Sequence, residues 1–431
     1  MSLRVLVRCA AAGAFLALAA APLFGQHPGD RDDQLEERVG SAEPDPWAGE
    51  DRALREALGI VSYGPFEWAD HHGTSKIQEV LGDVTIRWVE TAHFRIGSAL
   101  GSYRIPQADK AQRAKLRAEL EELEEVLPEV DPKTKVLDPW LRVHLFARRL
   151  EQQYADIQGL LGVTDTDFPR EPTRNPTSQI VPDYHGEGPY LGMPAKFTVL
   201  LLEKQSDLGR YTLRFLGAQK DTTTRHLFHE VFERSNLFLG VATEAHERFY
   251  ADDTRLHCHV AFSMTHNLVH AYKYYWHTLP CWVAEGLAHW YARGVFEENN
   301  NWSGIYETSS GLRNEWNWVP KIYARVKEDY FPGAAELMAK TDYSQLRFAE
   351  HMMIWSRVEY LLTQEDPARF ARFLDRLSDR IPEVQPGSLP TPEQVLVHQQ
   401  RAWEAAYELP PEEFDRRWKA WVLKEFKKRK R

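Results

Sequence analysis

Residues 265–291, with the sequence THNLVHAYKYYWHTLPCWVAEGLAHWY, constrain the fold more than any other stretch of this chain. His266 and His270 are four residues apart, so a helix would place both imidazoles on one face, about 6 Å apart along its axis. Pro280 then favours the start of a second helix, which carries Glu285 on an otherwise apolar face. A buried carboxylate without a partner is costly. The sequence therefore predicts two packed helices whose polar side chains meet.

The three polar side chains of this helix pair suit a metal ion. Imidazoles and carboxylates are common ligands of zinc, and one zinc ion can bind two imidazoles that lie one helical turn apart. The spacing alone is weak support, because a chain with 17 histidines contains roughly 0.7 such pairs by chance. The alternatives are histidines that bond to protein groups, and a salt bridge between Glu285 and a lysine or arginine.

The same stretch resembles the zinc core of the gluzincin metallopeptidases, the thermolysin-like and aminopeptidase-like group of peptidase MA type. Their pattern is His-Glu-x-x-His on one helix and a ligand glutamate on the next. LPCWVAEGLAHWY is similar to the exported and bacterial members, and ETAHFRIGS and the helical C-terminal part show a looser similarity. The resemblance implies zinc as the cofactor, with His266, His270 and Glu285 as its ligands.

Asn267 stands where the resemblance places the general base of these peptidases, a glutamate that takes a proton from the zinc-bound water. An amide has no protonation change near neutral pH, so Asn267 cannot do this. The loss of a positioned acid–base group typically lowers the rate by about 10²–10⁴. We therefore expect an exported zinc-binding protein of metallopeptidase fold that is catalytically weak or inactive.

Other residues could surround the ligands or line the cleft. His289 lies one turn after Glu285, where many gluzincins carry an acidic residue that orients a ligand histidine. His259 lies seven residues before His266 on the same helical stripe, and Tyr291 follows closely after His289. We assign His289, His259 and Tyr291 to the surroundings of the site. Further candidates are Glu230, Glu233, Glu297 and Glu298 as substitute bases, and Tyr291, His351 and Tyr360 as groups that stabilise an oxyanion.

Two other functions stay open at this point. The chain could be an active zinc metallopeptidase whose base comes from elsewhere in the sequence. It could instead be an exported module that binds a peptide or a glycan through aromatic rings, although packing in a core explains such rings as well. The tryptophans near the two helices are Trp276, Trp282, Trp290, Trp302, Trp316 and Trp318.

The charge of the chain bears on its partners. The formal net charge is −10, and an acidic chain of this kind is not expected to bind nucleic acid. A peptide or protein ligand is compatible with the predicted site. The pattern predicts no particular oligomeric state.

The first 25 residues are typical of a signal peptide, because Arg4 and Arg8 precede an apolar run from Ala10 to Phe24. No later stretch has 18 consecutive apolar residues, so we expect a secreted or periplasmic protein with no membrane contact beyond the signal peptide.

The expected fold is α+β, with a mainly helical zincin-like domain and a small β-sheet. The predicted segments are a signal peptide (1–25), a disordered acidic leader (26–50), an N-terminal α/β region (51–165), a Pro/Gly-rich linker (166–194) and the metallopeptidase domain with its helical C-terminal part (195–431).

Cys258 and Cys281 both follow the predicted signal peptide. If the two helices run antiparallel with Glu285 facing His266, Cys258 lies about 12 Å from His266 along the first helix. Cys281 lies about 6 Å from Glu285 in the direction of the turn. The two offsets add, and a disulfide requires Cα atoms within about 7 Å. We therefore expect two unbonded thiols.

Overall fold

The computed structural model describes residues 44–69, 71–171, 185–228, 236–246, 252–274, 279–300, 317–384 and 390–429. Residues Ala42–Arg431 form one compact unit. The predicted signal peptide (1–25) and most of the predicted leader (26–50) lie outside the described residues. Asp45, near the end of that leader, is buried, so the chain is already packed at this residue.

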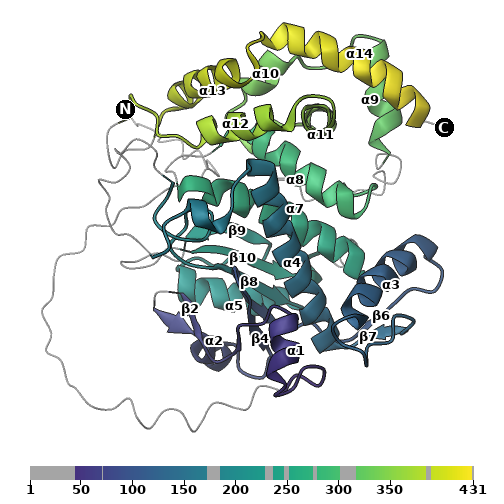
Figure 1. Ribbon diagram of the computed structural model, residues 1–431, viewed down its shortest axis with the longest axis vertical. Helices are drawn as coiled ribbons and strands as arrows, with labels where there is room; N and C mark the ends of the chain where they lie inside the picture. Colours follow the sequence, from purple (N-terminus) through teal and green to yellow (C-terminus); the bar gives the residue numbers. More distant parts are fainter. Residues whose placement is uncertain are drawn as a thin grey trace, which may run out of the picture. The chain divides into compact units, whose positions relative to one another are not determined.

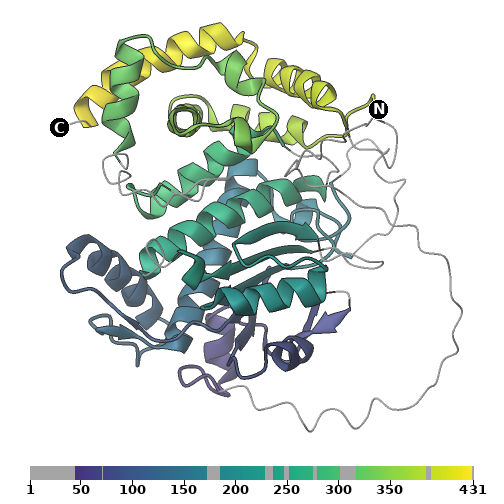
Figure 2. The same cartoon turned by 180° about the vertical axis from the view of Figure 1, so that it is seen from behind.

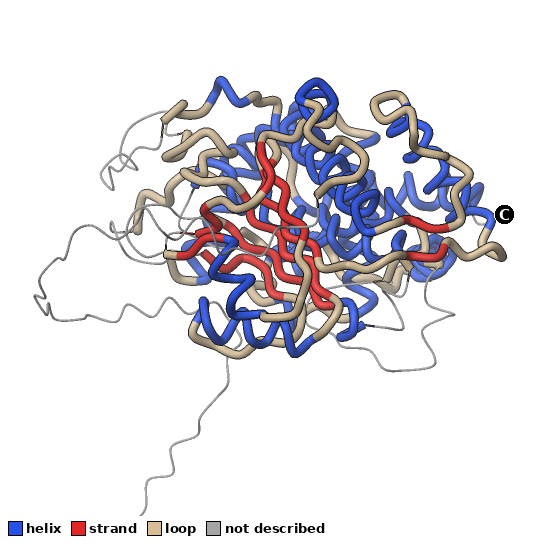
Figure 3. Tube along the Cα trace, turned by 90° about the horizontal axis from the view of Figure 1, so that it is seen from below, coloured by secondary structure: helices blue, strands red, loops and turns tan. Residues whose placement is uncertain are grey.

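A six-stranded sheet organises the fold (Figure 3). In spatial order its strands are β1 (Ser62–Tyr63), β4 (Arg87–Glu90), β5 (Phe94–Ser98), β8 (Phe197–Leu202), β10 (Leu237–Ala242) and β9 (Thr224–Phe228). The pairs β5–β8 and β8–β10 are parallel, and the other pairs are antiparallel. Short strands form two further pairs, β2 (Glu67–Ala69) with β3 (His72–Gly73) and β6 (Tyr103–Arg104) with β7 (Val136–Leu137). The sheet takes strands from both sides of the predicted linker (166–194).

Helices make up most of the remaining structure (Figure 1). They are α1 (Arg52–Ala57), α2 (Thr74–Leu81), α3 (Lys110–Glu124), α4 (Pro139–Leu161), α5 (Gln205–Leu216), α7 (Asp253–Ala271), α8 (Cys281–Val295), α9 (Trp318–Lys327), α10 (Ala334–Met338), α11 (Phe348–Thr363), α12 (Pro367–Leu377), α13 (Pro392–Tyr407) and α14 (Pro411–Arg429). None of the helices within the described ranges is long and apolar enough to cross a bilayer. The combination of a small mixed sheet with many helices confirms the predicted α+β class.

The sequence of β8 explains why helices cover both faces of the sheet. All six residues of FTVLLL are buried, as is typical of a strand that is covered on both sides. Because side chains alternate along a strand, Val199 and Leu201 join the large core cluster that includes α7 and α8. Leu200 and Leu202 join the cluster that includes α2 and α5. Figure 2 shows α5 on the face of the sheet opposite to α7.

Helix α7 is fixed firmly at its start. The side chain of Asp252 accepts a hydrogen bond from the backbone N–H of Arg255 at 2.6 Å, which caps the helix. The buried carboxylate of Asp253 lies 3.2 Å from Arg142 and 2.8 Å from Arg149, both on α4. These charge-assisted bonds set the position of α7 relative to α4.

Helices α8 and α11 approach each other closely at a glycine. A Cβ atom on Gly286 would lie 2.5 Å from Cγ2 of Val358 and 2.8 Å from Cγ2 of Ile354. Only glycine lacks that atom, so only glycine permits this distance between the two helices. The approach brings side chains of α11 within reach of polar groups on α8.

The two cysteines are unbonded and buried, which confirms the prediction. Cys258 packs with Phe262 and Ala288, and Sγ of Cys281 donates to the carbonyl oxygen of Lys340 at 3.1 Å. Burial raises the pKa of each thiol to about 12. Both side chains are therefore protonated packing groups at neutral pH.

His93 links the start of β5 to α4 and to the chain that follows α4. Its Nδ1 lies 2.6 Å from Glu151, its Nε2 lies 3.1 Å from Asp165, and its ring stacks on Tyr154. Burial alone would lower the pKa of His93, but the hydrogen bonds and charges of Glu151 and Asp165 raise it above its ordinary value. The fold therefore stabilises the charged imidazole.

The variant His93→Gln should destabilise the protein more at pH 5.5 than at pH 9. A pKa that folding raises contributes stability that is fully present below the unfolded value of about 6.5 and is lost as pH rises through the folded value. We expect a loss of about 1–2 kcal/mol at pH 5.5, measured by urea unfolding. The control Arg52→Gln removes an exposed pair with Glu56 and should change little at either pH. Equal losses at both pH values for His93→Gln would contradict this assignment.

Candidate metal site

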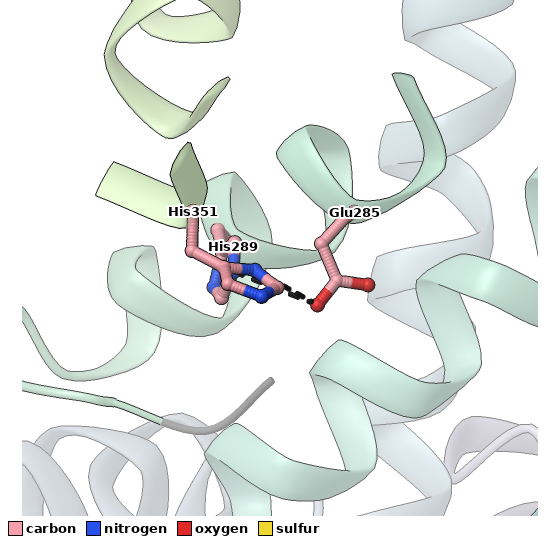
Figure 4. Close-up of side chains that lie close together, drawn as sticks. All are labelled: Glu285, His289 and His351. Carbon is pink, nitrogen blue, oxygen red and sulfur yellow. Dashed lines mark hydrogen bonds and ion pairs between the residues drawn. The ribbon is translucent and has the colours of Figure 1, made fainter. Parts of the chain in front are cut away.

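Four polar side chains meet where three helices pack together. Glu285 and His289 lie one turn apart on α8, His266 comes from α7 and His351 comes from α11. All four are fully buried, and Figure 4 shows Glu285, His289 and His351 close together. We call these four residues the histidine–glutamate cluster. Groups of this kind are stable in a dry interior only when they satisfy one another or bind an ion.

Each oxygen of the Glu285 carboxylate faces a different histidine. Oε2 lies 3.1 Å from Nε2 of His266, and Oε1 lies 3.2 Å from Nδ1 of His351. Nε2 of His289 lies 3.7 Å from Oε1 and 3.1 Å from Nδ1 of His351. The ligand atoms of Glu285, His289 and His351 all lie within 4.8 Å of one another, so these three residues could hold one metal ion.

The donor atoms fit such an ion by their chemistry. Nε2 of His289 and Nδ1 of His351 face each other as well as the same carboxylate oxygen. Without a metal ion, one of these two nitrogens must carry a hydrogen and donate it to the other. A metal ion would instead accept a lone pair from both nitrogens and from the carboxylate. Among the described residues, His266, His289 and His351 form ion pairs with Glu285.

The protonation states of the cluster are those that metal binding requires. Burial alone would raise the pKa of Glu285, but the close side chains of His266 and His351 hold it well below its ordinary value. Burial, with a smaller effect of Arg225, lowers the pKa of His266 to about 4. Burial also holds the pKa of His289 well below its ordinary value. At neutral pH the site therefore offers an ionised carboxylate and neutral imidazoles from these two histidines.

The structure brings two of the three predicted ligands into direct contact, His266 and Glu285. The third, His270, lies beside His266, with ring centroids 6.2 Å apart and 18° between the ring planes. Nδ1 of His270 donates to the carbonyl oxygen of His266 at 2.7 Å. With Nδ1 as the donor, Nε2 is the ring nitrogen on the side that a metal ion could bind. The ligand set His266, His270 and Glu285 stays a prediction.

His289 and His351 are more central than the sequence indicated. The sequence places His289 beside the ligands and offers His351 only as an oxyanion candidate. The sequence predicts that His289 lies beside Glu285, because the two residues are one helical turn apart. No spacing rule links His351 to Glu285, since α11 reaches α8 only through the close approach at Gly286.

Tyr343 is a neighbour of the cluster that the sequence did not reveal. It lies on the short helix η7 (Tyr343–Gln345), and its ring packs edge-on to His266 with centroids 5.6 Å apart. Its hydroxyl is buried and has no hydrogen-bond partner among the described residues. Burial, with the charge of Glu285, raises the pKa of Tyr343 far above its ordinary value. The hydroxyl is therefore a neutral donor near the cluster.

Asn267 connects α7 to the sheet. Its side chain is fully buried, and Nδ2 donates to the carbonyl oxygen of Phe238 on β10 at 3.1 Å. An ionised carboxylate has no hydrogen to donate, so it cannot make this bond. The residue at the position of the expected general base therefore holds a helix against a strand.

The other predicted residues have contacts of their own. Nε2 of His259 lies 2.7 Å from the hydroxyl of Thr223. Tyr291 and Glu297 line a cavity at the C-terminal end of α8, and Tyr360 donates to a carboxylate beyond the end of α11. Outside the described residues lie Glu230, Glu233, Trp276, Trp302 and Trp316.

Asn267→Glu should destabilise the protein by about 2 kcal/mol or more, because it places a buried carboxylate against the carbonyl oxygen of Phe238. Asn267→Gln has the same length as glutamate but keeps the amide donor, so it serves as the matched control and should cost clearly less. Urea unfolding at pH 7.5 measures both. Equal losses for the two variants would show that side-chain length, rather than the missing donor, limits this position.

Comparisons of the chain with protein-family models, with curated proteins and with solved structures found no match. The histidine–glutamate cluster and the hydrogen bond of Asn267 to β10 are the features of this chain that bear on its function.

Proposed function

We propose that this protein binds zinc in a site of metallopeptidase type and hydrolyses peptides weakly or not at all. The observation that carries the proposal is the fully buried Glu285, whose two oxygens face His266 and His351. Export of the protein is part of the proposal and rests on the basic and apolar pattern of residues 1–25.

Zinc is the ion that best matches the donors. Neutral imidazole nitrogens and one carboxylate oxygen form the ligand set found in many zinc sites, whereas magnesium and calcium prefer sets made of oxygen alone. Glu285 would be a ligand in either arrangement, with His289 and His351 or with His266 and His270. The anchoring role of Glu285 therefore does not depend on which histidines bind.

Bound zinc lowers the pKa of a coordinated water and polarises a carbonyl group. The rest of the chemistry of hydrolysis needs a group that moves a proton. Asn267 cannot serve, because its amide donates to the backbone of β10 and does not titrate. The hydroxyl of Tyr343 is a donor, and its raised pKa makes it a poor base at neutral pH. These residues support binding of the ion and disfavour efficient turnover.

An aromatic binding surface is the weaker candidate function. Trp282 and Trp318 belong to the main core cluster, so these two rings contribute to packing rather than to an exposed surface. Trp290 is partly buried against the same cluster and also lines the cavity at the end of α8. Of these three rings, Trp290 alone lines that cavity, so the three do not share one binding surface.

The purified chain should bind about one equivalent of zinc per molecule at pH 7.5, measured by metal analysis after dialysis and by competition with a chromophoric chelator. Glu285→Gln should lower the affinity for zinc by about 100-fold or more, because it removes the one charged donor of the cluster. The matched control is His93→Gln, which changes a different histidine–carboxylate contact. Zinc binding that Glu285→Gln leaves unchanged would refute the site.

The zinc-loaded chain should cleave casein and peptide libraries no faster than its Glu285→Gln variant. The physical reason is the missing acid–base group, which typically accounts for about 10²–10⁴ in rate. Activity that appears only in the folded fraction of Asn267→Glu would support the assignment of position 267. Robust zinc-dependent turnover by the unmodified chain would overturn the weak-catalyst part of the proposal and leave the zinc site intact.

A further inference from the structure

Three ligand atoms of the histidine–glutamate cluster form a triangle of the size that a tetrahedral ion requires (Figure 4). Nδ1 of His351 lies 3.2 Å from Oε1 of Glu285 and 3.1 Å from Nε2 of His289, and Nε2 of His289 lies 3.7 Å from Oε1 of Glu285. Zinc binds nitrogen and oxygen ligands at about 2.0–2.1 Å, so its tetrahedral ligands lie about 3.3 Å apart. One point can therefore lie within bonding distance of all three atoms.

The alternative ligand set, His266, His270 and Glu285, is less compact. Among the described residues, the group of three whose ligand atoms all lie within 4.8 Å of one another consists of Glu285, His289 and His351. His266 contacts the other carboxylate oxygen, Oε2, at 3.1 Å. His270 follows one turn later, and its ring centroid is 6.2 Å from that of His266. The positions of the side chains thus favour the set that α8 and α11 share.

The charge of the cluster limits it to one ion. Glu285 supplies one carboxylate, and its two oxygens face the two ligand sets. Two divalent ions that share a site typically lie about 3.5–4 Å apart. One carboxylate offsets a single positive charge, so the repulsion between two such ions in a buried site would remain largely uncompensated. The two ligand sets are therefore alternatives, and one ion occupies only one of them.

Burial bears on what an ion in the α8–α11 set can do. Glu285, His289 and His351 are all fully buried, whereas His270 is partly exposed. A catalytic zinc keeps one coordination position open to water and substrate. An ion held by three fully buried side chains would be shielded from a peptide. This position therefore suits an ion that stabilises the fold better than one that cleaves a substrate.

The ligands of this set also connect distant parts of the chain. His289 on α8 and His351 on α11 are 62 residues apart in the sequence, and the two helices approach each other closely at Gly286. An unfolded chain does not hold such ligands together, so an ion that binds them favours the folded contact between α8 and α11.

We propose that the ion is bound by Oε1 of Glu285, Nε2 of His289 and Nδ1 of His351, and that it joins α11 to α8 in a structural role. This inference rests on the zinc binding proposed above and goes beyond it, because it assigns the ligand atoms and relates the ion to stability rather than to hydrolysis. His266 contacts Oε2, the oxygen that does not bind the ion, and so orients the carboxylate.

The ring nitrogen that binds zinc distinguishes the two ligand sets. His351 presents Nδ1 to the carboxylate, whereas Nδ1 of His270 donates to a backbone oxygen, so His270 could bind only through Nε2. NMR spectra of the full chain labelled with ¹⁵N in histidine should show, after zinc is added, one histidine that binds through Nδ1. This signal should be missing in His351→Gln. Zinc bound through Nε2 nitrogens alone would overturn the assignment.

Two variants rank the histidines by their effect on affinity. His351→Gln should weaken the binding of zinc by about 100-fold or more, because it removes a ligand, and the loss in His270→Gln should be at least about 10-fold smaller. Competition with a chromophoric chelator measures both, with His93→Gln as the control for the loss of a histidine outside the cluster. Equal losses, or a larger loss in His270→Gln, would overturn the inference and leave the proposed zinc binding intact. An unmodified chain that binds no zinc would overturn both.

Hydrogen exchange on the unmodified chain tests the structural role without variants that could fold poorly. Removal of zinc by a chelator should lower the midpoint of thermal unfolding by about 2 °C or more. It should also speed exchange around Glu285 on α8 and around His351 on α11. Faster exchange confined to α7 around His270, with α11 unaffected, would place the ion in the other ligand set and refute the structural role.

Discussion

The burial of the Glu285 carboxylate is the constraint on which the centre of this structure depends. An ionised carboxylate in a dry interior costs several kcal/mol unless donors or a cation surround it. The fold supplies them from three helices, because His266 comes from α7 and His351 from α11. The glycine at position 286 permits the close packing of α8 on α11. The charge compensation of Glu285 and the packing of α8 on α11 therefore depend on each other. A substitution of Glu285 or of Gly286 would disturb both.

Asn267 shows how one position can serve the fold at the expense of chemistry. Its amide donates to the carbonyl oxygen of Phe238 and so connects α7 to β10. A glutamate at this position would have to turn away from that carbonyl to act as a base, and the bond between helix and strand would be lost. An ionised glutamate could take up a proton from a substrate, but it could not donate to this buried carbonyl oxygen. The structure thus gives the asparagine a positive role in the packing of the fold.

The sequence predicted the helix pair, the unbonded cysteines and the contact of His266 with Glu285, because each depends on local spacing. It did not predict that strands from both sides of residues 166–194 form one sheet, since strand pairing between distant segments leaves no periodic signal. His351 and Tyr343 reach the cluster only through tertiary packing. The sequence could supply the helix spacing of the site but not the partners that other helices bring to it.

Helix α8 relates the buried cluster to the cavity at its end. Glu285, His289 and Arg293 stand at successive positions four residues apart, so they follow one stripe over about 12 Å of the helix. The ring of Trp318 packs edge-on to His289 at 5.0 Å and lies 4.1 Å from the guanidinium of Arg293. The positive charge of Arg293 also contributes to the low pKa of His289, after the larger effect of burial. Any shift of Arg293 must therefore be accommodated by Trp318, which also packs on His289. A residue of the cavity wall is in this way part of the environment of the cluster.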